Sequence, residues 1–160
     1  MNRTAPALLV LVLALSGCGG SSDEASTTSP ESETGTVSRV VDGDTIRLTD
    51  GQRVRLVQID SPELHLRACY GARARSELEE LLPRGRRVRL ELDAKLDQVD
   101  EHGRQLAYVF AGSENANVEQ VRRGAARLFF YRGRHGRYAD QLIQAAREAR
   151  SAGRGLWSAC

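Results

Sequence analysis

Residues 54–63 read Val-Arg-Leu-Val-Gln-Ile-Asp-Ser-Pro-Glu, and this stretch decides the prediction of the fold. Its β-branched and apolar residues predict a strand from Val54 to Ile59, with Arg55 on it. Asp60 and Glu63 follow the strand. The proline between them fixes its own φ and keeps the preceding serine extended. The two acidic side chains are therefore predicted to project from a rigid corner at the end of a strand.

Short strands are also predicted on both sides of this stretch. They cover Val37 to Val41, Thr45 to Leu48, Arg87 to Leu92 and Gln105 to Phe110. Asp50-Gly51 lies between two of the β-rich runs, which is a strong hairpin signal. The run from Arg87 alternates strictly, so one face is expected to be buried and the other charged.

Three helices are predicted between and after the strands. Ala74, Leu78, Leu81 and Leu82 have helical spacing before Pro83. Asn117 and Gln120 resemble a capping box that opens a short helix ending at Gly124. A last helix from about Tyr138 to Gly153 has an apolar face of Leu142, Ile143, Ala146 and Ala149. Five short strands and three α-helices predict an α+β domain, and a small closed barrel leaves no bare strand edges.

The N-terminus has the pattern of an export signal. A basic start precedes the apolar run Ala5 to Leu15, which at about 11 residues is too short for the ~20 needed to span a bilayer. The residues before Cys18 resemble the lipobox of bacterial lipoproteins. The resemblance implies that residues 1–17 are a signal peptide, that Cys18 carries lipid and that the chain is exported and anchored to a bacterial membrane. A buried N-terminal element with an incidental cysteine is the alternative.

A polar segment separates Cys18 from the predicted domain, residues 37–160. Residues 18–36 are small, polar and without a periodic apolar face, which predicts a flexible linker. The full chain carries 23 basic and 21 acidic residues, but one arginine and four acids precede Thr36. The remainder therefore carries 22 basic and 17 acidic residues, a net charge of +5. A basic surface suits a polyanion such as nucleic acid, although inert domains carry similar charge.

Cys69 and Cys160 remain once Cys18 is lipidated. Thiols of an exported protein meet oxidising conditions and commonly pair, so a disulfide between these two residues is predicted. Two unpaired thiols are the alternative.

Two further stretches carry charged residues at turns. Asp42-Gly43-Asp44 lies at a strand junction, and taken alone it is typical of a plain turn. Residues 100–108 place Arg104 directly after a glycine turn.

Residues 42–44, 55–63 and 100–108, in this chain order, resemble the staphylococcal nuclease (thermonuclease) family over roughly Val37 to Trp157. The family fold is an OB-fold β-barrel of five strands with three α-helices. The resemblance implies calcium-dependent hydrolysis of DNA and RNA, with cleavage of the bond to the 5′ oxygen. A monomer is expected.

Carried over by position, the resemblance implies a ligand set for calcium and a set of catalytic residues. The metal ligands would be Asp44, Asp60 and the carbonyl of Ser61, with Asp42 in the outer shell. Arg55 and Arg104 would bind the phosphate, and Glu63 would take the proton from the attacking water or position it. The chemistry agrees, since oxygen ligands suit a hard cation and guanidinium groups stabilise a phosphodiester transition state. Spacing alone does not bring Arg104 to Arg55.

Phe130 and Arg132 occupy the positions where the family has two tyrosines that line the nucleotide pocket. Base stacking is expected to survive there, and burial of Phe129 and Phe130 in the core is the alternative. His65, His102 and His135 are expected to be solvated loop residues.

Two other functions remain open at this point. One is a catalytically inert OB-fold lipoprotein that holds nucleic acid at the cell surface, and it predicts loss of a metal ligand, an arginine or the base. The other is a surface-anchored structural or partner-binding domain, which predicts no dependence on metal.

Overall fold

The computed structural model describes residues 32–160. The predicted signal peptide, the lipidation residue Cys18 and most of the predicted linker lie outside the described residues. Within residues 32–160, no helix is long and apolar enough to cross a membrane.

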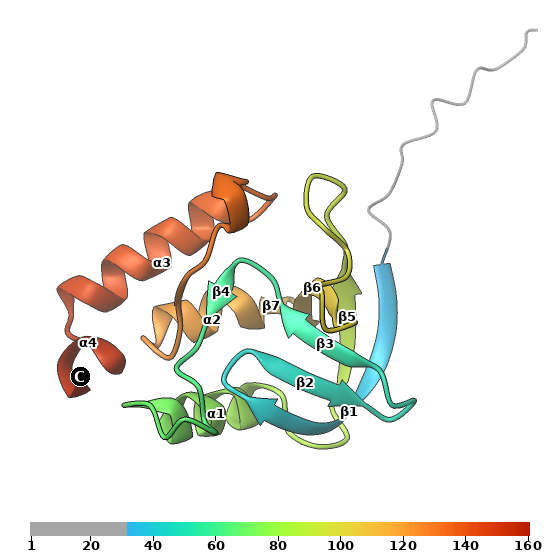
Figure 1. Ribbon diagram of the computed structural model, residues 1–160, viewed down its shortest axis with the longest axis horizontal. Coiled ribbons are helices and arrows are strands. Elements are labelled where there is room, and N and C mark those ends of the chain that lie inside the picture. Colours follow the sequence, from blue (N-terminus) through green and yellow to red (C-terminus); the bar gives the residue numbers. More distant parts are fainter. Residues whose placement is uncertain (1–31) are drawn as a thin grey trace, which may run out of the picture.

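Within this part of the chain, five strands close into a barrel (Figure 1). They are β1 (Ser32–Asp42), β2 (Thr45–Leu48), β3 (Arg53–Leu56), β5 (Arg87–Glu91) and β6 (Gln105–Ala111). Their order is β3-β2-β1-β5-β6 with antiparallel neighbours, and parallel pairing of β3 with β6 closes the ring. A short β7 (Glu114–Asn115) folds back on the end of β6. The predicted five-stranded barrel is confirmed.

β1 is longer than the sequence predicted. It begins at Ser32 rather than Val37, so the last residues of the predicted linker are strand. Residues 32–36 pair with β5, and residues 37–42 pair with β2, so one strand belongs to both halves of the barrel. The early half contains little apolar sequence. Its strand structure comes from backbone pairing with β5, which hydrophobic periodicity does not reveal.

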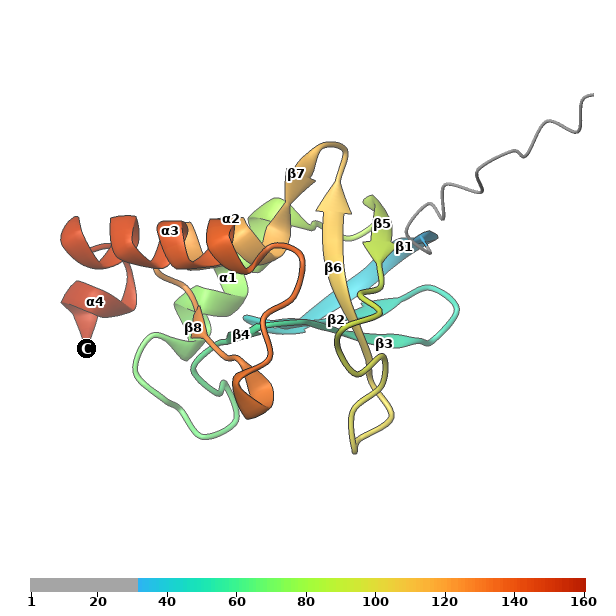
Figure 2. The same ribbon diagram turned by 90° about the horizontal axis from the view of Figure 1, so that it is seen from above.

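The predicted strand from Val54 to Ile59 is interrupted. β3 ends at Leu56, Val57 and Gln58 form a turn, and β4 (Ile59–Asp60) follows. Gln58 has a φ of 65°, which a continuous strand does not allow. β4 leaves the barrel and pairs with β8 (Arg127–Leu128), between the barrel and the C-terminal helices (Figure 2). The break therefore moves Asp60 off the barrel wall.

Three main helices lie where the sequence predicted them. They are α1 (Gly71–Leu81), α2 (Ala116–Arg122) and α3 (Ala139–Ser151). A short α4 (Leu156–Ala159) and a 3-10 turn η1 (Tyr131–Gly133) complete the described elements. The α+β class and the three α-helices are confirmed.

The predicted capping box of α2 is wrong. Asn115 caps this helix, and its side chain accepts hydrogen bonds from the N–H groups of Asn117 and Val118. Asn117 and Gln120 are fully buried instead. Asn117 bonds the backbones of Val57, Ala107 and Val109, and Gln120 bonds those of Gly43 and Ala74. Their amides thus satisfy buried backbone groups where the helix packs on the barrel.

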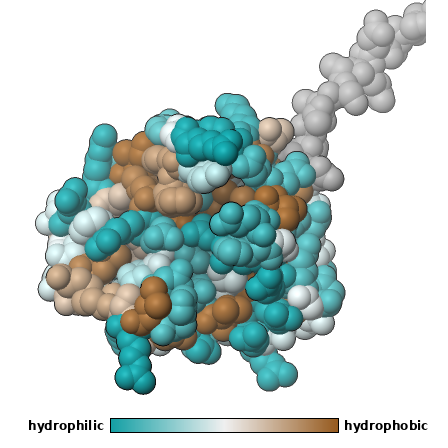
Figure 3. Space-filling view, in the orientation of Figure 1, coloured by the Kyte–Doolittle hydropathy of each residue, from teal (hydrophilic) through white to brown (hydrophobic). Residues whose placement is uncertain are grey.

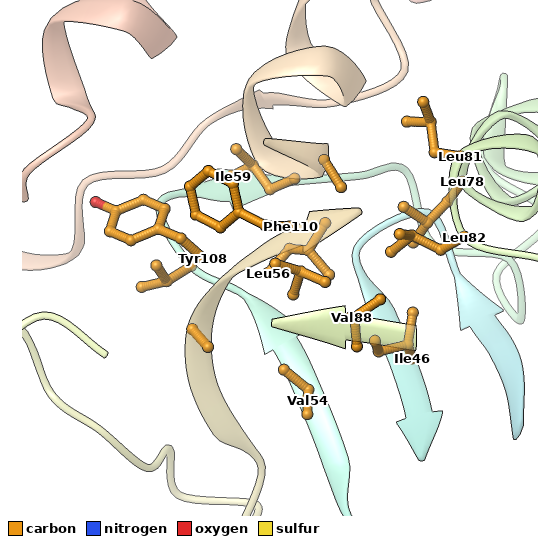
Figure 4. Close-up of a cluster of buried hydrophobic side chains, with 14 of the residues drawn as sticks. Ile46, Val54, Leu56, Ile59, Leu78, Leu81, Leu82, Val88, Tyr108 and Phe110 are labelled. Carbon is orange, nitrogen blue, oxygen red and sulfur yellow. The ribbon is translucent and has the colours of Figure 1, made fainter. Parts of the chain in front are cut away.

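The core fills the barrel and the space beneath the helices (Figure 4). Ile46, Val54 and Leu56 of the barrel are fully buried, and Leu78 and Leu82 at α1 close one end. On the face seen in Figure 3, hydrophobic patches are separated by hydrophilic side chains. The large apolar side chains that stay exposed are few among the described residues: Leu66, Val99, Phe129 and Tyr131.

A disulfide joins Cys69 to Cys160, with the two Cα atoms 5.9 Å apart. It ties the last residue of the chain to the loop that precedes α1. This loop follows Glu63, so the disulfide lies close in sequence to a candidate site residue.

Candidate active site

The turn between β1 and β2 carries Asp44 and holds it in a buried position. Asp44 is 5% exposed; its Oδ1 accepts from the hydroxyl of Thr45 at 2.9 Å, and its Oδ2 accepts from the N–H of Ser61 at 2.9 Å. A Cβ at Gly43 would lie 2.7 Å from the Cβ atoms of both Ala74 and Ser61. Only glycine lets the turn approach α1 and Ser61 this closely. The sequence Asp42-Gly43-Asp44, which taken alone is typical of a plain turn, therefore holds the Asp44 carboxylate in a fixed position.

Arg55 on β3 reaches both predicted acidic metal ligands. Its Nη2 lies 2.9 Å from Oδ1 of Asp60 and 3.5 Å from Oδ2 of Asp44. Its Nη1 donates to the carbonyl of Ile59 at 2.9 Å. The side chain is 11% exposed, so its position is set by packing and hydrogen bonds together. One guanidinium therefore holds a carboxylate of the β1–β2 turn and a carboxylate of β4 within reach of each other.

Asp42, Asp44, Asp60 and Glu63 form a corner of carboxylates that repel one another. Burial raises the pKa of Asp60, the charges of Asp44 and Glu63 raise it further, and Arg55 acts against them. Burial and the charge of Asp44 raise the pKa of Asp42 to about 6. Asp42 accepts the N–H of Asp44 at 3.2 Å and so braces the turn. The corner holds more negative charge than one arginine neutralises.

Glu63 lies beyond Asp60 on the loop that leads to α1. Its side chain is 51% exposed, and one carboxylate oxygen lies 3.2 Å from Nδ1 of His65. His65 is itself 73% exposed, His102 is 63% exposed, and His135 is also exposed. The prediction that the three histidines are solvated loop residues is confirmed. Glu63 is therefore accessible to water and acts electrostatically on Asp60.

Arg104 comes close to Arg55 through strand pairing. β3 and β6 are parallel, and Arg55 pairs with Leu106. Arg104 precedes β6, and its Nε donates to Asp100 at 2.6 Å. Burial alone would raise the pKa of Asp100, but hydrogen bonds from Arg104 and His102 lower it below the ordinary value. Neighbouring strands thus supply the proximity that sequence spacing did not predict.

Arg55 and Arg104 line one cavity of about 340 Å³. Phe129 and Tyr131 also line it, with exposed fractions of 45% and 51%. The guanidinium of Arg55 lies 5.6 Å from the centre of the Phe129 ring. Arg55 therefore stands between the carboxylate corner and an open, aromatic-walled cavity.

The aromatic residues at the cavity differ from those expected. Phe130 and Arg132 were predicted there, but Phe130 packs on His135, with ring centres 4.3 Å apart, and Arg132 is exposed. Phe129 and Tyr131, on either side of Phe130, line the cavity instead. Burial of Phe129 in the core is also wrong, because nearly half of its side chain is exposed.

Gln58 is a positioning residue that the sequence did not reveal. Its side chain accepts from the hydroxyl of Tyr108 at 2.8 Å and from the N–H of Gly136 at 3.1 Å, and it donates to the carbonyl of Arg134 at 2.8 Å. Gln58 is 4% exposed. It fixes the 129–136 segment, which forms the cavity wall, to the barrel. Its one visible sequence signal is a polar residue inside an apolar run.

The donor chemistry of the corner fits a hard divalent cation. The carboxylates of Asp44 and Asp60 face a common arginine nitrogen, and the backbone of Ser61 lies against Asp44. Within residues 32–160, no three Asp, Glu, His or Cys side chains converge on one point. Two carboxylates and a carbonyl would leave room for water and phosphate oxygens, which calcium accepts as ligands.

Comparison with known proteins places these residues in a family context. The sequence profile of the family described as "Staphylococcal nuclease homologue" matches residues 53–159. The chain is similar to a thermonuclease of Staphylococcus hyicus, 33% identical over 159 residues that cover 95% of this chain and 92% of that protein. It is 38% identical to a thermonuclease of Staphylococcus intermedius over 139 residues, which cover 82% of this chain and 80% of that protein. It is 35% identical to the SPbeta prophage-derived endonuclease YokF of Bacillus subtilis (strain 168) over 130 residues, which cover 77% of this chain and 43% of that protein.

Proposed function

Because the chain belongs to the staphylococcal nuclease homologue family, we propose that it is a calcium-dependent endonuclease that hydrolyses phosphodiester bonds in DNA and RNA. The observation that carries the proposal is the position of Arg55. It contacts Asp44 and Asp60 and lines the same cavity as Arg104. The names of the relatives, thermonuclease and endonuclease, support the same reaction class.

In this proposal the two arginines bind the phosphate. A phosphate in the cavity meets guanidinium groups from two strands, and arginine presents paired N–H donors that match phosphate oxygens. Arg55 and Arg104 are held by Asp60 and Asp100 without substrate. The side chains are therefore oriented before substrate arrives, and little ordering is required when the phosphate binds.

Glu63 receives the proton of the attacking water, or holds that water in line with the phosphorus. Its carboxylate is half exposed, so water reaches it. Nδ1 of His65 lies 3.2 Å from one oxygen of this carboxylate. A calcium ion held by Asp44, Asp60 and the Ser61 carbonyl would add positive charge for the phosphate oxygens.

Substitution of Glu63 tests the proposal. In Glu63→Gln, loss of the base is expected to lower kcat by about 10²- to 10⁴-fold with KM little changed. Glu114→Gln is the matched control, since Glu114 on β7 is exposed and lies outside the cavity, and its cleavage rate is expected to stay within twofold of wild type. The assay is cleavage of labelled single-stranded DNA and RNA by the purified chain with calcium. A wild-type rate in Glu63→Gln would remove Glu63 from this role.

We also propose that the chain acts outside the cytoplasm as a monomer, anchored to a bacterial membrane by lipid on Cys18. The lipobox-like residues before Cys18 support this location. Calcium is abundant outside the cytoplasm, which agrees with the proposed cofactor. Mass spectrometry of the mature N-terminus from a bacterial host is expected to show diacylglyceryl-modified Cys18. An unmodified N-terminus that retains residues 1–17 would contradict it.

A further inference from the structure

A second cavity of about 360 Å³ lies between β8, α3 and α4. Arg127, Arg147, Arg150 and Trp157 line it together with apolar side chains. All three arginines are exposed. Within residues 32–160, none of them has an acidic side-chain oxygen within 4.0 Å, whereas the arginines at α2 are paired with Glu77, Glu80 and Glu119. The positive charge of Arg147 and Arg150 is therefore not neutralised by a contacting acid of this part of the chain, and Arg127 interacts with Asp60 only beyond contact distance.

Trp157 orients two of these arginines without cancelling their charge. The guanidinium of Arg150 lies 4.9 Å from the centre of a Trp157 ring, and that of Arg127 lies 5.7 Å from it. A cation–π contact holds a guanidinium in place and leaves N–H donors available for an anion. Because no acidic side chain of residues 32–160 occupies these N–H donors, they are available to bind phosphate oxygens.

The second cavity is connected to the proposed active site by one short segment, residues 127–131. Arg127 pairs with Asp60 across the β4–β8 ladder, so it adjoins a proposed metal ligand. Arg127 and Leu128 line the second cavity, and Phe129 and Tyr131 line the first. Figure 2 shows β4 and β8 between the barrel and the helices α3 and α4. A linear polyanion that fills the first cavity can follow this segment into the second.

We propose that the cavity formed by β8, α3 and α4 is a second binding site for the phosphate backbone of the substrate, which holds a nucleic-acid strand beyond the scissile phosphate. The inference rests on the proposed nuclease function and extends it. Substrates long enough to reach both cavities bind more tightly than short ones. Affinity falls as salt concentration rises, and each phosphate contact to a single strand steepens this dependence. Two such contacts increase the magnitude of the slope of log affinity against log salt concentration by about 1.4.

The test neutralises Arg147 and Arg150 together. Arg127 is left intact because it adjoins Asp60. Arg84→Gln/Arg86→Gln is the matched control: it removes the same charge from two exposed arginines in the turn before β5 that also lack an acidic partner among the described residues. Binding of a fluorescent 30-nucleotide single strand is measured in chelator, which separates binding from cleavage. Cleavage with calcium is measured on that strand and on a trinucleotide.

In Arg147→Gln/Arg150→Gln, affinity for the 30-nucleotide strand and its kcat/KM are expected to fall about tenfold. Trinucleotide cleavage is expected to stay at the wild-type rate, and the salt slope to fall by about 1.4 relative to the control. Equal affinity and salt slope in the test and control variants would overturn the inference. Tight binding by wild type without cleavage would instead overturn the nuclease function, and loss of affinity in the test variant would still support the second site. No binding by wild type in chelator together with no cleavage in calcium would overturn both.

Discussion

Gly43 sets the distance between the two proposed acidic metal ligands, because it lets the Asp44 turn press against Ser61. In Gly43→Ala, the new methyl group would lie 2.7 Å from the Cβ atoms of Ala74 and Ser61, so one of these elements has to move. We expect a loss of about 1–3 kcal/mol of stability from overpacking. Urea unfolding measures it, and a parallel assay should show slower cleavage. Unchanged stability would mean that the turn has room to adjust.

Gln58 is proposed to affect substrate binding by holding the cavity wall in place, and not by contacting the phosphate. In Gln58→Leu, Tyr108 and two backbone groups lose their partner, and we expect about 2–4 kcal/mol of destabilisation. Because the 129–136 segment loosens, KM for a nucleic-acid substrate should rise more than kcat falls. Gln141→Leu on the exposed side of α3 is the control and should change neither. A fall in kcat with constant KM would contradict this role.

At the scale of elements, Glu91 of β5 fastens α3 to the barrel. Tyr138, at the start of the helix, donates its hydroxyl to Glu91 at 2.6 Å, and Arg137 lies 3.3 Å away. Burial would raise the pKa of Glu91, but hydrogen bonds from Tyr138 and Arg89 outweigh it and leave the pKa below the ordinary 4.5. The ionised carboxylate thus stabilises the folded state.

The sign of this shift predicts an acid-dependent loss of stability. A carboxyl group whose pKa is lower in the folded state contributes stability above its unfolded pKa, and loses it as pH falls through the folded pKa. Stability should therefore fall as pH drops below about 4.5, and Glu91→Gln should show a smaller fall over the same range. Thermal unfolding from pH 7 to 3 measures it. Parallel pH curves for the two proteins would contradict the assignment.

The strands and helices were predictable where periodicity is strong, and the errors have local causes. The helix before Pro83 and the hairpin around Asp50-Gly51 follow from apolar spacing and turn residues. The break at Gln58 did not, because its left-handed backbone is held by partners far along the chain. For the same reason the sequence suggested Asn117 as a cap, although its side chain bonds the backbone of β6 and of the turn at Val57.

The site residues were predictable through family resemblance, and their proximity was not predictable from spacing. Arg55 and Arg104 meet because β3 and β6 run parallel, a pairing set by barrel closure. Phe129 and Tyr131, rather than the predicted Phe130 and Arg132, line the cavity, and Phe130 packs on His135 instead. Such long-range pairing leaves no signature in the local sequence.

At the scale of the whole molecule, the Cys69–Cys160 disulfide ties the C-terminal residue to the loop before α1. The bridged residues are 91 apart in sequence, so the chain-entropy model gives a contribution of about 4 kcal/mol. In Cys69→Ser/Cys160→Ser, the midpoint of urea unfolding should fall accordingly. Reductant should lower the midpoint of wild type to the same value and leave the variant unchanged. Equal midpoints without reductant would show that the bridge does not stabilise the fold.

The basic charge of the domain and its two cavities suit a substrate longer than a single nucleotide. In the proposed mechanism, a divalent cation held by Asp44 and Asp60 is required for phosphodiester hydrolysis. The most direct measurement is cleavage of a labelled DNA strand by the purified chain in chelator and after calcium is restored. We predict no cleavage in chelator and full recovery with calcium. Cleavage that continues at the same rate in chelator would contradict the claim.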